Sequence, residues 1–122
     1  MATNAPVTVV DIVNAKDDAL DEVDDQIATT SNLQQGGANP AVDDALTKLR
    51  AKRTEIDQQA VNAIADSAEL AAALATMKTA ITGMNKTAGN MKTATGVVNN
   101  ITTFLGYGTQ VVGALKKVNG SV

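Results

Sequence analysis

Apolar residues recur at every seventh position over more than half of the chain. A repeat of seven is typical of α-helices that pack side by side along their length. We call this line of residues the heptad seam and expect it to be buried between neighbouring helices. Its eleven positions are Val42, Leu49, Ile56, Ala63, Leu70, Met77, Met84, Met91, Val98, Leu105 and Val112.

The middle of the heptad seam is rich in methionine, within the stretch "MKTAITGMNKTAGNMKTATGV" at 77–97. Methionine is flexible and fills irregular gaps beside small residues, which favours a core position for these side chains over a ligand-binding face. The period alone does not decide whether the seam closes on its own chain or on a second copy. If the seam meets a partner, the candidate interaction face consists of Met77, Met84, Met91, Val98 and Leu105.

A first helix is predicted over residues 8–32 because apolar residues there follow three- and four-residue steps. Thr8 and Asp11 have the spacing of a capping box, with an acid at the end of the motif. The β-branched opening "PVTVVDIV" also suits a short strand, but the sequence offers such a strand no partner. The apolar stripe consists of Val9, Ile12, Val13, Ala19, Leu20, Val23 and Ile27.

A loop is predicted at 33–39, where two consecutive glycines can turn the chain. Asn39 and Pro40 then have the residue types preferred at the N-cap and the first position of a helix. The heptad seam predicts that this second helix runs over about 40–82. Glycines weaken a helix, and their clustering predicts a kink or turn at 83–90, followed by a third helix over about 90–117.

These elements predict an all-α fold, either an elongated helical hairpin or a three-helix antiparallel bundle with a heptad-like Ala/Leu/Met seam, in one domain over 1–122. The composition agrees with this prediction. Hydrophobic residues make up 44% of the chain, but Phe104 and Tyr107 are its only aromatic residues. A core of Ala, Val, Leu, Ile and Met favours close-packed helices over a β-sandwich, which usually draws on aromatic residues.

The chain contains neither cysteine nor histidine. This excludes thiol nucleophiles, disulfides, imidazole bases and the ligands of most zinc, copper and haem sites. The sequence also has no glycine-rich phosphate loop and no nucleophile elbow. We therefore expect no catalytic residue, no cofactor and no bound metal. The low aromatic content argues against stacking on nucleic-acid bases, so no nucleic-acid partner is expected either.

Charge is distributed unevenly along the chain. Residues 1–69 hold all 13 acidic residues and have a net charge of −8, whereas residues 70–122 have a net charge of +5. We interpret this as two halves that lie side by side and partly neutralise each other. The only cationic cluster, "KLRAKR" at 48–53, is flanked by acidic residues and is interpreted as solvated helix surface.

The densest acidic stretch is "DDALDEVDD" at 17–25. On a helix Asp17, Asp21 and Asp24 share one face, which is the candidate acidic face. Carboxylates in this arrangement could hold Ca²⁺ or Mg²⁺ loosely, but the spacing of an EF-hand loop is absent. A solvated face, or one that lies against lysines of the basic half, is the favoured interpretation.

Residues 93–115 carry no charge and are followed by Lys116 and Lys117. Polar residues such as Asn99 and Asn100 would be costly in lipid, so we expect no monomeric transmembrane helix. Contact of an amphipathic helix over 93–117 with a membrane surface remains an alternative. The chain starts without an early positive charge, which predicts no cleavable signal peptide. A cytoplasmic location or export by a signal-independent route is expected.

The order of an acid-rich helix, a turn at "NP" and the segment "NPAVDDALTKL" at 39–49 resembles type III secretion needle subunits. The resemblance implies a helical hairpin that serves as a structural subunit of a secretion apparatus. The residues after Ile81 exceed the usual length of that family, and no family is assigned to the chain.

The sequence therefore predicts a non-enzymatic helical interaction or assembly protein, which binds a protein partner or itself through helix faces. Two alternatives stay open. One is a secreted or membrane-active helical protein whose residues 93–117 contact lipid, and the other is a structural subunit like those of a secretion apparatus.

Overall fold

The computed structural model describes residues 8–34, 39–59, 61 and 67–118, and all regular secondary structure within these ranges is helical. The four helices are α1 (Val9–Leu33), α2 (Pro40–Asp57), α3 (Ser67–Ala88) and α4 (Ala94–Val118). The predicted all-α fold is confirmed. The expected elongated helical hairpin or three-helix antiparallel bundle does not match exactly, because the described part of the chain forms four helices.

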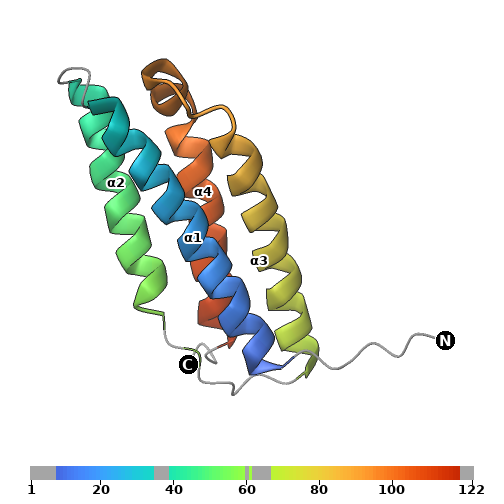
Figure 1. Ribbon diagram of the computed structural model, residues 1–122. Helices are drawn as coiled ribbons and strands as arrows, with labels where there is room; N and C mark the ends of the chain where they lie inside the picture. Colours follow the sequence, from blue (N-terminus) through green and yellow to red (C-terminus); the bar gives the residue numbers. More distant parts are fainter. Residues whose placement is uncertain (1–7, 35–38, 60, 62–66, 119–122) are drawn as a thin grey trace.

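The four helices run alternately up and down and lie side by side as an elongated bundle (Figure 1). Helix α1 packs against α2 and α3, and α4 packs against the same two helices from the opposite corner. Helices α1 and α4 also touch across the diagonal. The turn between α3 and α4 lies at the same end of the bundle as the end of α1 (Figure 1).

The predicted single helix over 40–82 is wrong, since α2 ends at Asp57 and α3 begins at Ser67. A continuous helix of that length would extend for roughly 65 Å, whereas the 25 residues of α1 span only about 37 Å. The excess would have no helix beside it to cover its apolar stripe. Reversal after Asp57 instead places the apolar residues of α3 against α1 and α4.

The first two helices begin where the sequence predicts. Helix α1 covers 9–33 against a predicted 8–32, and the Asp11 carboxylate accepts a hydrogen bond of 2.9 Å from the backbone N–H of Thr8. At the start of α2, the side-chain oxygen of Asn39 accepts from the backbone N–H groups of Ala41 and Val42. These bonds satisfy donors that the first turn of a helix leaves free.

The chain turns after Ala88, later than most of the predicted 83–90 region, and α4 starts at Ala94. Helix α3 continues through Gly83 and ends at Ala88. In the turn that follows, the backbone N–H groups of Asn90 and Met91 donate to the backbone oxygens of Thr87 and Ala88. The predicted third helix over 90–117 corresponds to α4.

One core cluster extends through all four helices. Every described heptad-seam position from Val42 to Met91 is buried, while Ala63 lies outside the described residues. Beyond the turn Val98 of the heptad seam is 41% exposed, although its last member, Val112, is buried. The register changes there, because α4 fully buries a second heptad line that starts six residues after Met91 rather than seven. Its members, which are all fully buried, are Val97, Phe104, Val111 and Val118.

Candidate functional site

The three methionines of the candidate interaction face lie inside the bundle. Met77, Met84 and Met91 are each 0% exposed and belong to the core cluster. The heptad seam thus closes on helices of its own chain at these positions, and contact between these side chains and a partner would require the bundle to open.

The other two members of the candidate interaction face point elsewhere. Val98 is 41% exposed, and Leu105 is partly buried against the core between α4 and α2. The structure therefore does not bring the five predicted residues onto one surface. The reason is the register change at the α3–α4 turn, which moves the buried line one residue towards the N-terminus.

The candidate acidic face is only partly solvated. Asp17 and Asp21 are exposed on the outside of α1. Asp24 lies beside α2 and forms an ion pair of 2.6 Å between its Oδ1 and Nε of Arg53. The hydrogen bond to Asp24, together with the negative charge of that carboxylate, raises the pKa of the Arg53 guanidinium. Within the described ranges no group of three acidic side chains is placed to hold a metal ion.

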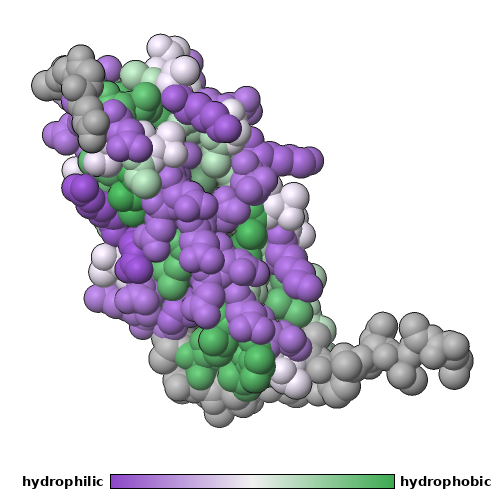
Figure 2. Space-filling view, in the orientation of Figure 1, coloured by the Kyte–Doolittle hydropathy of each residue, from purple (hydrophilic) through white to green (hydrophobic). Residues whose placement is uncertain are grey.

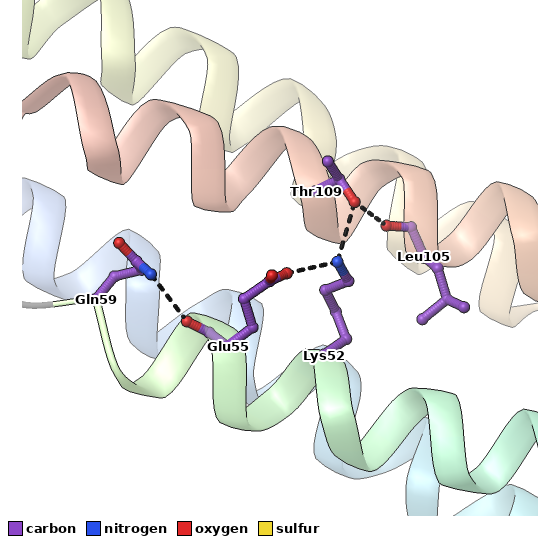
Figure 3. Close-up of polar contacts among 5 residues, drawn as sticks. All are labelled: Lys52, Glu55, Gln59, Leu105 and Thr109. Atoms are coloured by element: carbon purple, nitrogen blue, oxygen red, sulfur yellow. Dashed lines mark hydrogen bonds and ion pairs between the residues drawn. The ribbon is translucent and has the colours of Figure 1, made fainter. Parts of the chain in front are cut away.

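The cationic cluster at 48–53 is neutralised by neighbouring acids. Lys48 pairs with Asp44 at 3.0 Å, in the order that is favourable along a helix. Figure 3 shows that Nζ of Lys52 donates to Oε1 of Glu55 at 2.6 Å and to Oγ1 of Thr109 at 3.0 Å. Because Thr109 belongs to α4, Lys52 links α2 to α4. Three of the four cations in this cluster thus form ion pairs with acids of the chain.

Two of the glycines make room for side chains of neighbouring helices. A methyl group on Gly83 of α3 would overlap the ring of Tyr107, which lies across this position from α4. A methyl group on Gly108 would lie 2.8 Å from Cγ of Lys52, whose aliphatic stem crosses α4 there. The sequence "GYG" at 106–108 thus has a packing role at two of its three positions.

Two further glycines of α4 have no such explanation. Gly106 and Gly113 lie away from the ends of α4 and are exposed to solvent. A Cβ atom added to either would meet no described atom of another element within 4 Å. Both glycines lie on the outer side of α4, two turns apart, because seven residues correspond to nearly two helical turns. The exposed residues between them, Thr109 and Gln110, are uncharged.

A shallow groove of about 390 Å³ runs between α3 and α4 beside Gly113. Small side chains form most of its walls, and one carboxylate and one ammonium group also border it. The groove is lined by Glu69, Ala72, Ala73, Thr76, Gln110, Gly113, Ala114 and Lys117. It offers a close approach to two helix backbones rather than a deep pocket with converging polar groups.

Lys16 and Gln26 of α1 make polar contacts with distant segments that were not predicted. Nζ of Lys16 donates to the backbone oxygens of Asp57 and Gln59 at 3.0 and 2.7 Å, which satisfies carbonyl groups at the C-terminal end of α2. Gln26 of α1 is buried and donates to the backbone oxygen of Met91. Lys16 has no sequence signal, but Gln26 falls three residues after Val23 on the apolar stripe, where a polar residue is unexpected.

The face of the bundle that carries α1 is mainly hydrophilic (Figure 2). An apolar patch lies at the lower end of α1, where Val10 and Val13 are 64% and 38% exposed. Among the described residues no helix is both long and apolar enough to cross a membrane.

Comparison of the chain with family models, curated proteins and solved structures found no match.

Proposed function

We propose that this protein is a non-enzymatic helical interaction or assembly protein. It binds a protein partner or a second copy of itself through the outer faces of its helices. The methionines of the heptad seam pack within the chain and are not available to a partner. A partner of the folded bundle therefore contacts the outer surfaces of its helices.

The pair of exposed glycines in α4 is the observation that carries the proposal. A glycine in a helix interior costs about 1 kcal/mol relative to alanine. Gly83 and Gly108 offset this cost by admitting Tyr107 and Lys52. Gly106 and Gly113 have no described neighbour that an added Cβ would meet. Small residues let another backbone approach a helix closely, and the adjacent groove between α3 and α4 extends the surface for such an approach.

The distribution of charge favours the same side of the molecule. The outer side of α1 carries Asp17 and Asp21, which would repel the same surface on a second copy. Helix α4 itself has no charged residue between Gly106 and Gly113, and the Lys52 ammonium of α2 beside Thr109 is paired with Glu55. A close helix-on-helix contact there leaves no charge without a partner.

The test replaces both glycines with glutamine, because Gly106→Gln with Gly113→Gln adds bulk without charge and improves helix propensity. The matched control is Asn14→Gln with Ala28→Gln, at two exposed positions of α1. Light scattering after size-exclusion chromatography measures self-association, and cross-linking in the source cells measures partner binding. The expected result is loss of association in the α4 double variant alone. Association that survives in this variant, or that is absent from the unmodified protein in both assays, contradicts the proposal.

Lipid contact through residues 93–117 is a second candidate, favoured by the exposed pair Lys116 and Lys117 at the end of α4. Apart from Val98 and the partly buried Leu105, the large apolar side chains of α4 face the core, so this function requires α4 to leave the bundle. Co-sedimentation with anionic and neutral vesicles tests it, and the absence of binding to both would end it. A structural subunit of a secretion apparatus would instead form long filaments, which electron microscopy of concentrated protein would reveal.

A further inference from the structure

One end of the bundle contains a buried polar contact between segments that are far apart in sequence. The side-chain amide of Gln26 in α1 donates to the backbone oxygen of Met91, which lies in the turn between α3 and α4, at 3.1 Å. The same nitrogen donates to Oγ1 of Thr30 at 3.1 Å. Gln26 is only 3% exposed and Thr30 is fully buried, so both bonds lie in the interior.

Met91 anchors the turn in two ways. It precedes α4 and lies outside any helix, yet its side chain is fully buried in the core cluster. Its backbone oxygen accepts the bond from Gln26, and its backbone N–H donates to Ala88 at 3.0 Å. The side chain of Met91 therefore packs in the core, and its backbone oxygen links the turn to α1 through a hydrogen bond.

Two other polar contacts between helices are more exposed than the bond from Gln26 to Met91. The Asp24–Arg53 ion pair and the hydrogen bond from Asn85 to Glu22 involve groups that solvent can reach. Water can replace a lost partner at such sites. A buried carbonyl that loses its donor has no such replacement and carries the full cost of desolvation. The bond from Gln26 to Met91 is thus the most expensive of these contacts to break.

We propose that Gln26 is a latch that holds the α3–α4 turn against α1 and keeps this end of the bundle closed. When the latch opens, the turn and the start of α4 separate from α1 before the rest of the bundle unfolds. The core residues nearest the turn, Met84 and Val97, then become accessible. A groove of about 360 Å³ between α1 and α3, lined in part by Gln26 and Lys92, lies beside the latch. The proposal does not depend on the binding surface of α4.

Native-state hydrogen exchange tests the latch, because local opening is read from individual amides. The reporters are the amides of Asn90, Met91 and Val97, which make hydrogen bonds in and beside the turn. Gln26→Met keeps the length of the side chain and removes the donor. We expect exchange at the three reporters to accelerate by about ten-fold, with a smaller change in α2.

Two control variants separate the latch from general destabilisation. Thr30→Val removes the hydroxyl acceptor but leaves the bond to Met91, so the reporter amides should exchange nearly as in the unmodified protein. Val23→Ala removes buried apolar volume one turn earlier in α1 and should accelerate exchange in all four helices alike. The proposal is overturned if Gln26→Met leaves the reporters unchanged or accelerates α2 as much as the turn. Gln26→Asn, whose amide is too short to reach Met91, repeats the test if Gln26→Met does not fold.

Discussion

Helices α3 and α4 form one hairpin and share a seven-residue spacing of apolar side chains, but they bury different registers of it. In α3 the heptad seam is fully buried at Met77 and Met84. In α4 its continuation is 41% exposed at Val98 and buried again only at Val112, while the fully buried line passes through Val97 and Phe104. Residues of a non-helical turn do not advance by the constant angle of an α-helix. A turn can therefore reset the register without interrupting the sequence period.

The largest expected difference is between adjacent residues of α4. Phe104→Ala leaves a cavity in the core and should lower the free energy of unfolding by about 3–5 kcal/mol. Leu105→Ala, at the partly buried position that the sequence period favours, should lower it by about 1 kcal/mol. Urea denaturation measures both, with equal m-values as the check that the same surface unfolds. Equal losses, or a larger loss at Leu105, would mean that the register of α4 is assigned wrongly.

The next difference lies within the heptad seam, between its members before and after the turn. Met84→Ala should lower the free energy of unfolding by about 2–5 kcal/mol because Met84 is fully buried. Val98→Ala should change it by no more than about 0.5 kcal/mol, as is usual for exposed positions. A comparable loss from both substitutions would show that the seam stays buried across the turn, against the structure.

The glycines of the hairpin should respond in opposite directions. Gly83→Ala forces the Tyr107 ring to move and should cost about 1–3 kcal/mol. Gly113→Ala meets no described atom and should stabilise α4 by about 0.5–1 kcal/mol. Thermal unfolding followed by circular dichroism measures both changes. Stabilisation by Gly83→Ala would contradict the packing of Tyr107 on α3.

The smallest expected effect concerns the partly exposed ion pair between Asp24 of α1 and Arg53 of α2. A double-mutant cycle with Asp24→Asn and Arg53→Gln should give a coupling of about 0.2–1 kcal/mol that decreases with added salt. Because the folded-state pKa of Arg53 is raised, its contribution is complete below the ordinary pKa of arginine. That contribution disappears only as the pH rises through the folded-state value. A coupling that changes between pH 7 and pH 10 would therefore have another source.

The first helix and the start of the second could be predicted because their signals are local. Asp11 accepts a hydrogen bond from the backbone of Thr8, and Asn39 accepts from the backbone N–H groups of Ala41 and Val42. Partners this close in sequence can be recognised from residue type and spacing alone. The end of α2 could not be predicted. The stretch 58–66 has no glycine or proline, and the seven-residue spacing of apolar residues continues through it from Ile56 to Ala63 and Leu70. The carbonyl groups at that end are instead satisfied by Lys16, 41 and 43 residues away.

For the candidate surfaces too, features set by one helix alone could be predicted, whereas features that depend on contacts with another helix could not. The exposure of Asp17 and Asp21 follows from the stripe of α1 alone. The roles of Gly83 and Gly108 depend on Tyr107 and Lys52, which other helices bring to them. The exposed pair Gly106 and Gly113 could be recognised only after the register of α4 was known. The heptad seam alone does not show which side of α4 faces solvent.

Thiol labelling of single cysteines tests the closed four-helix core and its register change most directly, because the chain has no cysteine of its own. Val97→Cys and Val98→Cys differ by one position and are labelled under native conditions at low protein concentration. The structure predicts that Cys at position 98 reacts nearly as fast as in the unfolded chain, and that Cys at position 97 reacts at least about 100-fold more slowly. Equal rates, or faster labelling at position 97, would contradict it.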